Sequence, residues 1–242
     1  MVSGAMTDVG MVRDNNQDSY FVPVNEDIPL FVVADGMGGH KAGEIASNMA
    51  INIIKDTFLK LKTLPMDEIS ITKLIEQSIK EANEKIYLKS IEKEAYSGMG
   101  TTVTLAYITN HKLCIGHVGD SRAYLFKDEN LIQITEDHSL VNELVKNGSI
   151  TLEEAKTHPQ RNIITRAVGT SETIEMDIVV REYEEGNILL LCSDGLTSMV
   201  KDSQIQDILS KEKNIQKACE NLVSLSNDNG GYDNTTVIAI KF

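Results

Sequence analysis

Four aspartates stand at or beside the ends of short apolar runs, and this recurrence constrains the fold more than any other feature of the chain. They are Asp35 after residues 31–34, Asp194 after residues 189–193, Asp120 after residues 117–119 and Asp233 just before residues 235–240. Burying carboxylates at strand ends is costly unless they are paired with cations or coordinate a metal. Lysines and arginines are too few nearby to pair all four. We therefore expect a scaffold whose strand ends gather these carboxylates around metal ions.

The residues that follow two of these aspartates favour a hard divalent cation. Gly36 and Gly195 come directly after Asp35 and Asp194, and a glycine beside a ligand lets a backbone carbonyl come close to an ion. Mn²⁺ and Mg²⁺ prefer such oxygen ligands. A pair of these ions, about 3.5–4 Å apart, can hold a hydroxide that attacks phosphorus in line. A single Asp-Gly pair is usually a turn, but its recurrence after two apolar runs favours the metal site.

The apolar pattern predicts both helices and strands. Apolar residues recur at helical spacing from Ile45 to Leu61 and from Ile71 to Ile86, and these stripes predict helices that pack on the core. Runs rich in β-branched residues predict strands at 101–108, 113–118, 123–126, 176–181, 187–192 and 235–240. We expect the first three to form an antiparallel meander, and a further helix at about 215–225.

The chain has 242 residues and no linker rich in proline, glycine or serine, so we predict one domain over residues 1–242. Blocks of short strands alternate with pairs of helices, which favours a layered α/β or α+β fold. Residues 137–170 are polar with short helical stretches, and we expect them to form an excursion or flap outside the core.

The negative net charge argues against nucleic acid as a partner and bears on how an anionic substrate could bind. The formal net charge is −13, and no cluster of lysine and arginine with interleaved aromatic residues offsets it, so nucleic acid is not expected as a partner. An anionic phosphate substrate would also be repelled unless bound cations supplied local positive charge.

The location of the chain is expected to be cytoplasmic. The first ten residues lack the pattern of a secretory signal, and no apolar run is long enough for membrane insertion. Cys114, Cys192 and Cys219 are odd in number and widely spaced, which indicates free buried thiols and not disulfides or a zinc site.

Six ordered motifs resemble those of the metal-dependent type 2C (PPM) serine/threonine protein phosphatases, in their bacterial branch. The motifs are Arg13-Asp14-Asn15-Asn16-Gln17-Asp18, Asp35-Gly36-Met37-Gly38-Gly39, Ser97-Gly98-Met99-Gly100-Thr101-Thr102, Gly119-Asp120-Ser121-Arg122, Ser193-Asp194-Gly195-Leu196 and Asp233-Asn234-Thr235-Thr236. Each motif alone is weak, but six in this order are very specific and span nearly the whole chain.

The resemblance implies a four-layer αββα sandwich, with two antiparallel sheets flanked by helices and with residues 137–170 as the bacterial flap. It also implies two Mn²⁺ or Mg²⁺ ions. By the family pattern Asp35 bridges both ions, Asp194 and Asp233 complete one site, and the Gly36 carbonyl serves the other, with Asp18 acting through water. Asp120 resembles the ligand of a third, weaker ion, and Arg13 matches the phosphate-binding arginine.

The family also implies a function and partners. The expected reaction is hydrolysis of phosphoserine and phosphothreonine in proteins by a metal-bridging hydroxide. The expected substrates are phosphoproteins made by a bacterial Ser/Thr kinase and the kinase itself, and the expected state is a monomer.

Two positions depart from the pattern of many eukaryotic members, which carry histidine where Met37 stands and glutamate where Gln17 stands. The first change removes the usual general acid, so we weigh His40 against an ordered or metal-bound water as the proton donor. A helix N-terminus beside His40 would lower the pKa of its imidazole, which favours water. Gln17 is expected to order water or backbone and not to ligate.

Other functions find less support in the sequence. No nucleotide-binding glycine loop, EF-hand loop or nucleophile elbow is complete. A catalytically silent binding module should have lost metal aspartates, whereas all the matched ones are present. A metal-dependent nuclease is disfavoured by the acidic charge, and a small-molecule phosphatase would be distinguished by its preference for nucleotides over a phosphothreonine peptide.

Overall fold

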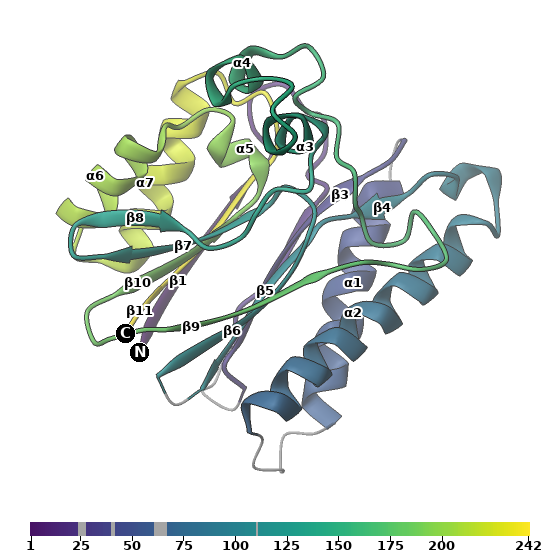
Figure 1. Ribbon diagram of the computed structural model, residues 1–242, viewed down its shortest axis with the longest axis horizontal. Coiled ribbons are helices and arrows are strands. Elements are labelled where there is room, and N and C mark those ends of the chain that lie inside the picture. The colour runs from purple at the N-terminus through teal and green to yellow at the C-terminus, as the bar shows by residue number, and fades with distance from the viewer. Residues whose placement is uncertain (24–27, 40–41, 61–66, 110) are drawn as a thin grey trace.

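The computed structural model describes residues 1–23, 28–39, 42–60, 67–109 and 111–242, and it places two antiparallel sheets face to face (Figure 1). The first sheet has the strand order β1-β11-β10-β7-β8, formed by Val2–Asp8, Thr235–Lys241, Ile188–Cys192, Arg122–Lys127 and Asn130–Gln133. The second has the order β2-β3-β5-β6-β9, formed by Asp18–Phe21, Leu30–Met37, Val103–Thr109, Lys112–Val118 and Asp177–Glu182. A two-residue strand, β4 (Gly100–Thr101), also pairs with β3.

Strand β3 shows why its apolar run is unbroken. Phe31 and Val33 point into the layer between the two sheets, where they meet Leu189 and Leu191 of strand β10. The alternate side chains of β3 contact the helices on the outer face of the same sheet. Because side chains alternate along a strand, a strand buried on both faces must be apolar at every position.

Helices cover both outer faces, which confirms the predicted four-layer arrangement. Helices α1 (Ala42–Lys60) and α2 (Glu68–Ser90) pack on the second sheet. The short α5 (Asp194–Thr197), with α6 (Asp202–Lys211) and α7 (Ile215–Asp228), packs on the first. Figure 1 shows the two groups of helices on opposite sides of the sandwich. No helix in the described ranges is long and apolar enough to cross a membrane.

Residues 137–170 connect β8 to β9, and their two helices lie outside the two sheets. They include α3 (Leu140–Lys146) and α4 (Leu152–Thr157), which lie at the same end of the molecule as α5 (Figure 1). Helix α4 begins with a capping box in which Thr151 and Glu154 exchange hydrogen bonds. A one-turn 3₁₀ helix, η1 (Glu94–Tyr96), follows α2.

The expected meander of three strands is wrong at its third member. Strands β5 and β6 pair as predicted, but β7 crosses to the other sheet and pairs with β8 and β10. The crossing occurs at Gly119, whose φ of 109° turns the chain in a way that only glycine adopts easily. The sequence also did not reveal β1, β2, β8 and α6.

The three cysteines are buried free thiols, as predicted. Burial raises the pKa of Cys114 to about 11 and those of Cys192 and Cys219 to about 12. These thiols are therefore protonated at neutral pH and act as small apolar side chains.

Gly116 of β6 lies where the second sheet packs against α2, so a substitution there tests this packing. A Cβ at this position would overlap the Ile75 side chain and lie 3.0 Å from Cδ1 of Ile79. We predict that Gly116→Ala lowers the free energy of unfolding by about 1–3 kcal/mol, the usual effect of overpacking a core. Urea unfolding measures this change. Gly39→Ala is the matched control, because a Cβ there meets nothing within 4 Å, and equal stability of the two variants would contradict the packing described.

Candidate active site

The strand pairing brings the predicted aspartates to one end of the sandwich. Asp18 and Asp35 are direct partners across β2 and β3. Asp194 comes two residues after β10, and Asp233 two residues before β11, which is the neighbour of β10. Asp120 lies in the crossing from β6 to β7. All five therefore lie where the two sheets end together.

Asp18 is the most enclosed of these carboxylates, with 8% of the residue exposed. Its Oδ2 accepts a hydrogen bond of 2.8 Å from the Ser193 hydroxyl, which joins the second sheet to the first. Its Oδ1 is buried without a hydrogen-bond partner. Burial raises the pKa of Asp18 to about 7, against the hydrogen bonds from Thr236 and Ser193.

Asp35 and Asp194 face each other across the end of the sandwich. Burial, with the charges of Asp18 and Asp194, raises the pKa of Asp35 well above its usual range. Burial and the charge of Asp233 raise the pKa of Asp194 to about 6, while a hydrogen bond from the Asp35 carboxyl opposes that rise. The Oδ1 atom of Asp194 is buried with no partner.

Asp120 extends this acidic cluster toward the flap. Burial, followed by the charges of Asp194 and Asp137, raises the pKa of Asp120 to about 8. Like charges so close to one another favour protonation of some carboxyls or the binding of cations between them.

Arg13 lies at the outer edge of the same cluster. Its Nη2 donates a hydrogen bond of 2.7 Å to Oδ2 of Asp233, and both side chains are partly exposed, at 53% and 37%. Four of its five N–H donors are left for another anion. The sequence-predicted Arg13 and the five aspartates are thus brought together, whereas His40 lies outside the described residues.

The residues of this cluster fit a divalent cation. Two buried carboxylate oxygens, one on Asp18 and one on Asp194, lack hydrogen-bond partners, and buried oxygens in this state are what a hard ion binds. Among the described residues, no three side chains of His, Cys, Asp or Glu already converge as a complete metal cage. Backbone oxygens and water would therefore complete the coordination.

Both glycines that follow Asp35 and Asp194 are required by packing. A Cβ on Gly36 would overlap the carbonyl oxygen of Gly43 at the start of α1. A Cβ on Gly195 would overlap the carbonyl oxygen of Asn234. These contacts hold Asp35 and Asp194 against neighbouring elements, which is a second reason for the Asp-Gly pairs beside any ligand role of the Gly36 carbonyl.

Asn234 organises the site, although the sequence reasoning gave it no role. Its Oδ1 accepts a hydrogen bond from the backbone N–H of Gln17, and its Nδ2 donates to the carbonyls of Val9 and Asn15. The Asn234 side chain therefore ties the segment that carries Arg13 to the end of β11. The only signal in the sequence was its place beside Asp233.

Two other motif residues, Thr102 and Met37, have structural contacts beside Asp35 and Gly100. The Thr102 hydroxyl accepts a hydrogen bond of 2.9 Å from the Asp35 backbone N–H, and the Thr102 N–H donates to the Asp35 carbonyl. Met37 packs beside Gly100, where a Cβ would lie 2.8 Å from its Cε. A methionine there has no proton to donate.

His138 attaches the flap to the turn that carries Asp120. Its backbone N–H donates to the Gly119 carbonyl, and its ring Nδ1 accepts from the Gly119 N–H at 3.1 Å. With Nδ1 as acceptor, the proton of the neutral ring is assigned to Nε2, which lies 3.2 Å from a carboxylate oxygen of Asp177. Burial lowers the pKa of His138, so the ring stays neutral near pH 7.

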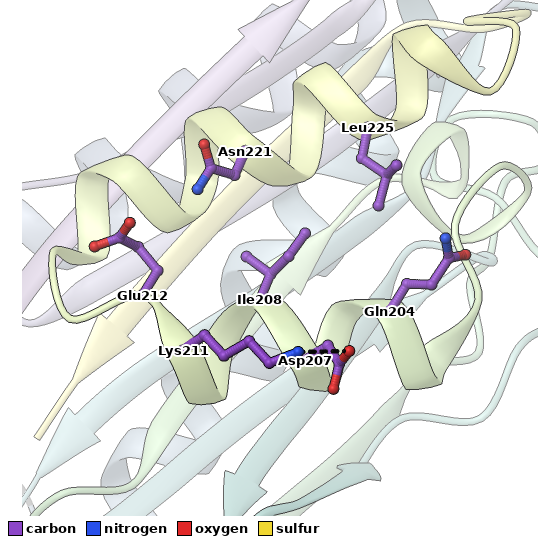
Figure 2. A pocket seen from close by; sticks show the side chains of 7 residues that line it. All are labelled: Gln204, Asp207, Ile208, Lys211, Glu212, Asn221 and Leu225. Carbon is purple, nitrogen blue, oxygen red and sulfur yellow. Dashed lines mark hydrogen bonds and ion pairs between the residues drawn. The ribbon is translucent and has the colours of Figure 1, made fainter.

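Of two hollows on the surface of the described residues, one reaches the acidic cluster. A cleft of about 660 Å³ lies between the flap and the start of α6, and Asp120 and Asp194 line it. The other, of about 370 Å³, lies between α6 and α7 (Figure 2). There Lys211 is already paired with Asp207 at 3.0 Å, and no group of titratable side chains converges, so this second hollow does not support chemistry.

Comparisons with known proteins agree on one family. The family model described as "Protein phosphatase 2C" matches residues 12–221. The protein phosphatase PhpP of Streptococcus pneumoniae is 41% identical over 237 residues, which cover 98% of this chain and 95% of that protein.

Solved structures are similar over almost the whole chain. A serine/threonine phosphatase of S. agalactiae has a TM-score of 0.91 at 40% identity and covers 98% of both chains. The catalytic domain of the serine threonine protein phosphatase PstP was solved in complex with two manganese ions. It has a TM-score of 0.85 at 34% identity, and the match covers 98% of this chain and 96% of that one.

The raised carboxyl pKa values predict how stability depends on pH when a chelator removes all divalent ions. A carboxyl with a raised pKa in the folded protein keeps its proton where the unfolded chain, with a pKa of about 3.9, releases it. Stability is therefore present at low pH and is lost as the pH rises through the raised values, which are about 6 for Asp194, 7 for Asp18 and 8 for Asp120. Thermal unfolding in chelator should show a lower Tm at pH 8 than at pH 5.

The same argument predicts that Asp35→Asn stabilises the chelated protein at pH 8, because an amide at this position cannot ionise beside the other carboxylates. A gain of about 1 kcal/mol would raise the Tm by about 2–4 °C for a chain of this size. Asp56→Asn, at an exposed position of α1, controls for the change in net charge. A chelated protein that is equally stable at pH 5 and pH 8 would contradict the electrostatics described.

Proposed function

Since the chain belongs to the protein phosphatase 2C family and is therefore a protein serine/threonine phosphatase, we propose that the carboxylates at the end of the sandwich form its active site. The observation that supports this most is the convergence of Asp18, Asp35 and Asp194 there, with two buried oxygens unpartnered. The substrate is a phosphoserine or phosphothreonine side chain of another protein.

The enzyme depends on divalent metal ions, and we propose that it uses two. The relative PstP was solved with two manganese ions, and the oxygen-only set here suits Mn²⁺ and Mg²⁺ equally. Asp35, Asp194 and Asp233 would hold the ions, with help from the Gly36 carbonyl and Asp18, and Asp120 would hold a third, weaker one. Bound ions supply positive charge to an anionic substrate and lower the pKa of water.

Arg13 is the residue that we propose grips the phosphate. One N–H of its guanidinium holds Asp233, which orients the planar group at the edge of the cluster. The remaining N–H donors match the spacing of phosphate oxygens, which a guanidinium binds in pairs. Asp233 then has two roles, because it orients Arg13 and is also one of the proposed metal ligands.

The leaving serine or threonine oxygen needs a proton, and we propose that an ordered water supplies it. Met37 packs against Gly100 and has no ionisable group. His40, the other candidate, lies outside the described residues. The gripped phosphate and the carboxylates around it would hold such a water in place.

The physiological partners follow from the chemistry and the relatives. We propose that the substrates are phosphoproteins made by a bacterial serine/threonine kinase, together with that kinase, because the relatives found are bacterial phosphatases. Such substrates arise where ATP is present, so the proposed location is the cytoplasm. We propose a monomer, for which light scattering is the test.

We predict that hydrolysis of a phosphothreonine peptide stops in excess chelator and returns with Mn²⁺ or Mg²⁺. Asp194→Asn should lower kcat/KM by more than about a hundredfold, because even groups that only support metal ligands are typically worth ten- to hundredfold. Asp207→Asn, which changes the same charge on exposed α6, should retain activity. Undiminished hydrolysis in chelator would refute the proposed function.

We predict that Arg13→Ala lowers kcat/KM for the phosphothreonine peptide by about tenfold to a hundredfold, since a hydrogen bond to a charged group contributes roughly 1.5–3 kcal/mol. Arg13→Lys should recover only part of this, because lysine keeps the charge but loses the planar pair of donors. Calorimetric titration with Mn²⁺ should show that both variants still bind metal. A kcat/KM unchanged in Arg13→Ala would leave Arg13 as a surface ion pair with Asp233.

A further inference from the structure

The cleft between the flap and α6 leads away from the acidic cluster. It measures about 660 Å³, and Asp120 and Asp194 form its inner end. One wall comes from α3, α4 and the segment after them, and the other comes from residues 197–202. Because the cleft begins at the reacting phosphate in the proposed function, its remaining length faces whatever is attached to that phosphate.

Four cationic side chains line the cleft, Arg122, Lys156, Arg161 and Lys201. Arg122 is held by Asp137 through three hydrogen bonds of 2.7–3.0 Å, so this cation is already neutralised. Lys156 is paired with Glu153 at 2.7 Å.

Arg161 and Lys201 differ from the other cations of the cleft. Both are exposed, and within the described part of the chain neither has a carboxylate partner. Asp202, the nearest acidic neighbour of Lys201 in sequence, accepts a hydrogen bond of 3.3 Å from the Tyr124 hydroxyl. On a chain whose net charge is −13, two unpaired cations that line one cleft from separate segments of the chain offer a local site for an anion.

The cleft also offers apolar surface for the atoms between the phosphate and that anion. Val141 and Val145 of α3 and Ala155 of α4 line the flap wall, and Met199 lines the other. Leu152 of α4 is 68% exposed at the same wall. Apolar side chains that solvent reaches in a cleft are typical of a surface that a partner covers.

We propose that this cleft binds the segment of the substrate next to the phosphorylated residue and selects an anionic side chain in it, held between Arg161 and Lys201. The proposal rests on the proposed phosphatase function and adds a substrate class to it. The anion is a carboxylate or a second phosphate group, since both have the same charge complementarity. An extended chain rises about 3.3 Å per residue, so the position of the anion in the peptide reports how far the anion site lies from the phosphothreonine.

The test uses the full chain with Mn²⁺ and phosphothreonine peptides that differ only at the flanking positions. One series carries Ala, Glu, Lys or a non-hydrolysable phosphonate residue two to four positions before the phosphothreonine, and a second series carries them after it. We expect one series to show a kcat/KM roughly threefold to tenfold higher for Glu or the phosphonate than for Lys. The preference should shrink as salt is added, because salt screens exposed charges.

Charge reversal assigns the preference to the cleft. In Lys201→Glu the preference should reverse toward the Lys peptides, and Arg161→Gln should reduce it. Lys211→Glu is the matched control, since Lys211 lies at the other end of the same helix, away from the cleft, and it should leave the preference unchanged. Lys201→Gln, which should reduce the preference without reversing it, replaces Lys201→Glu if thermal unfolding shows that the reversal harms folding.

The outcomes separate this inference from the proposed function. If the Ala peptides are hydrolysed but the flanking charge has no effect, or if Lys211→Glu changes the preference as much as Lys201→Glu, the anion site is refuted and the phosphatase function stands. If p-nitrophenyl phosphate is hydrolysed but no phosphopeptide is, the proposed function fails and this inference fails with it. A preference for the phosphonate alone supports the site and identifies its anion as phosphate.

Discussion

Mutual repulsion among buried carboxylates is the constraint on which the rest of this structure depends. Burial and neighbouring charges raise the pKa of Asp18, Asp35, Asp120 and Asp194, so the folded chain without cations resists ionising all of them together. Such a cluster lowers stability unless something else in the fold holds it together. The sandwich does so because the carboxylates lie where rigid strands end, and the same repulsion would be relieved by the cations that we propose bind there.

The frame around the carboxylates consists of hydrogen bonds and close backbone contacts. The Ser193 hydroxyl reaches across the sheets to Asp18, and Asn234 ties the N-terminal segment to β11. The glycines after Asp35 and Asp194 let α1 and the start of β11 approach without a side chain between them. These contacts fix the backbone positions of Asp18, Asp35 and Asp194 relative to one another, and preorganisation of this kind is what the proposed metal site requires.

The features of the fold that depend on local residue patterns could be predicted from the sequence. Helices α1 and α2 followed from their apolar stripes, and the aspartates at strand ends followed from the switch between apolar and acidic residues. It could not predict that β7 joins the other sheet, because strand pairing depends on distant segments and not on the turn before it. Asn234 and His138 were missed for a similar reason, since their partners Gln17 and Gly119 are remote in sequence.

The flap is attached to the turn that carries Asp120 through His138 and Asp137. His138 holds Gly119 by its backbone N–H and by its ring Nδ1, and Asp120 is the next residue. Asp137 accepts hydrogen bonds from Arg122, two residues after Asp120. The cleft that we assign to the flanking segment of the substrate has the flap as one wall and is lined by Asp120, so these bonds fix that wall relative to the turn of Asp120.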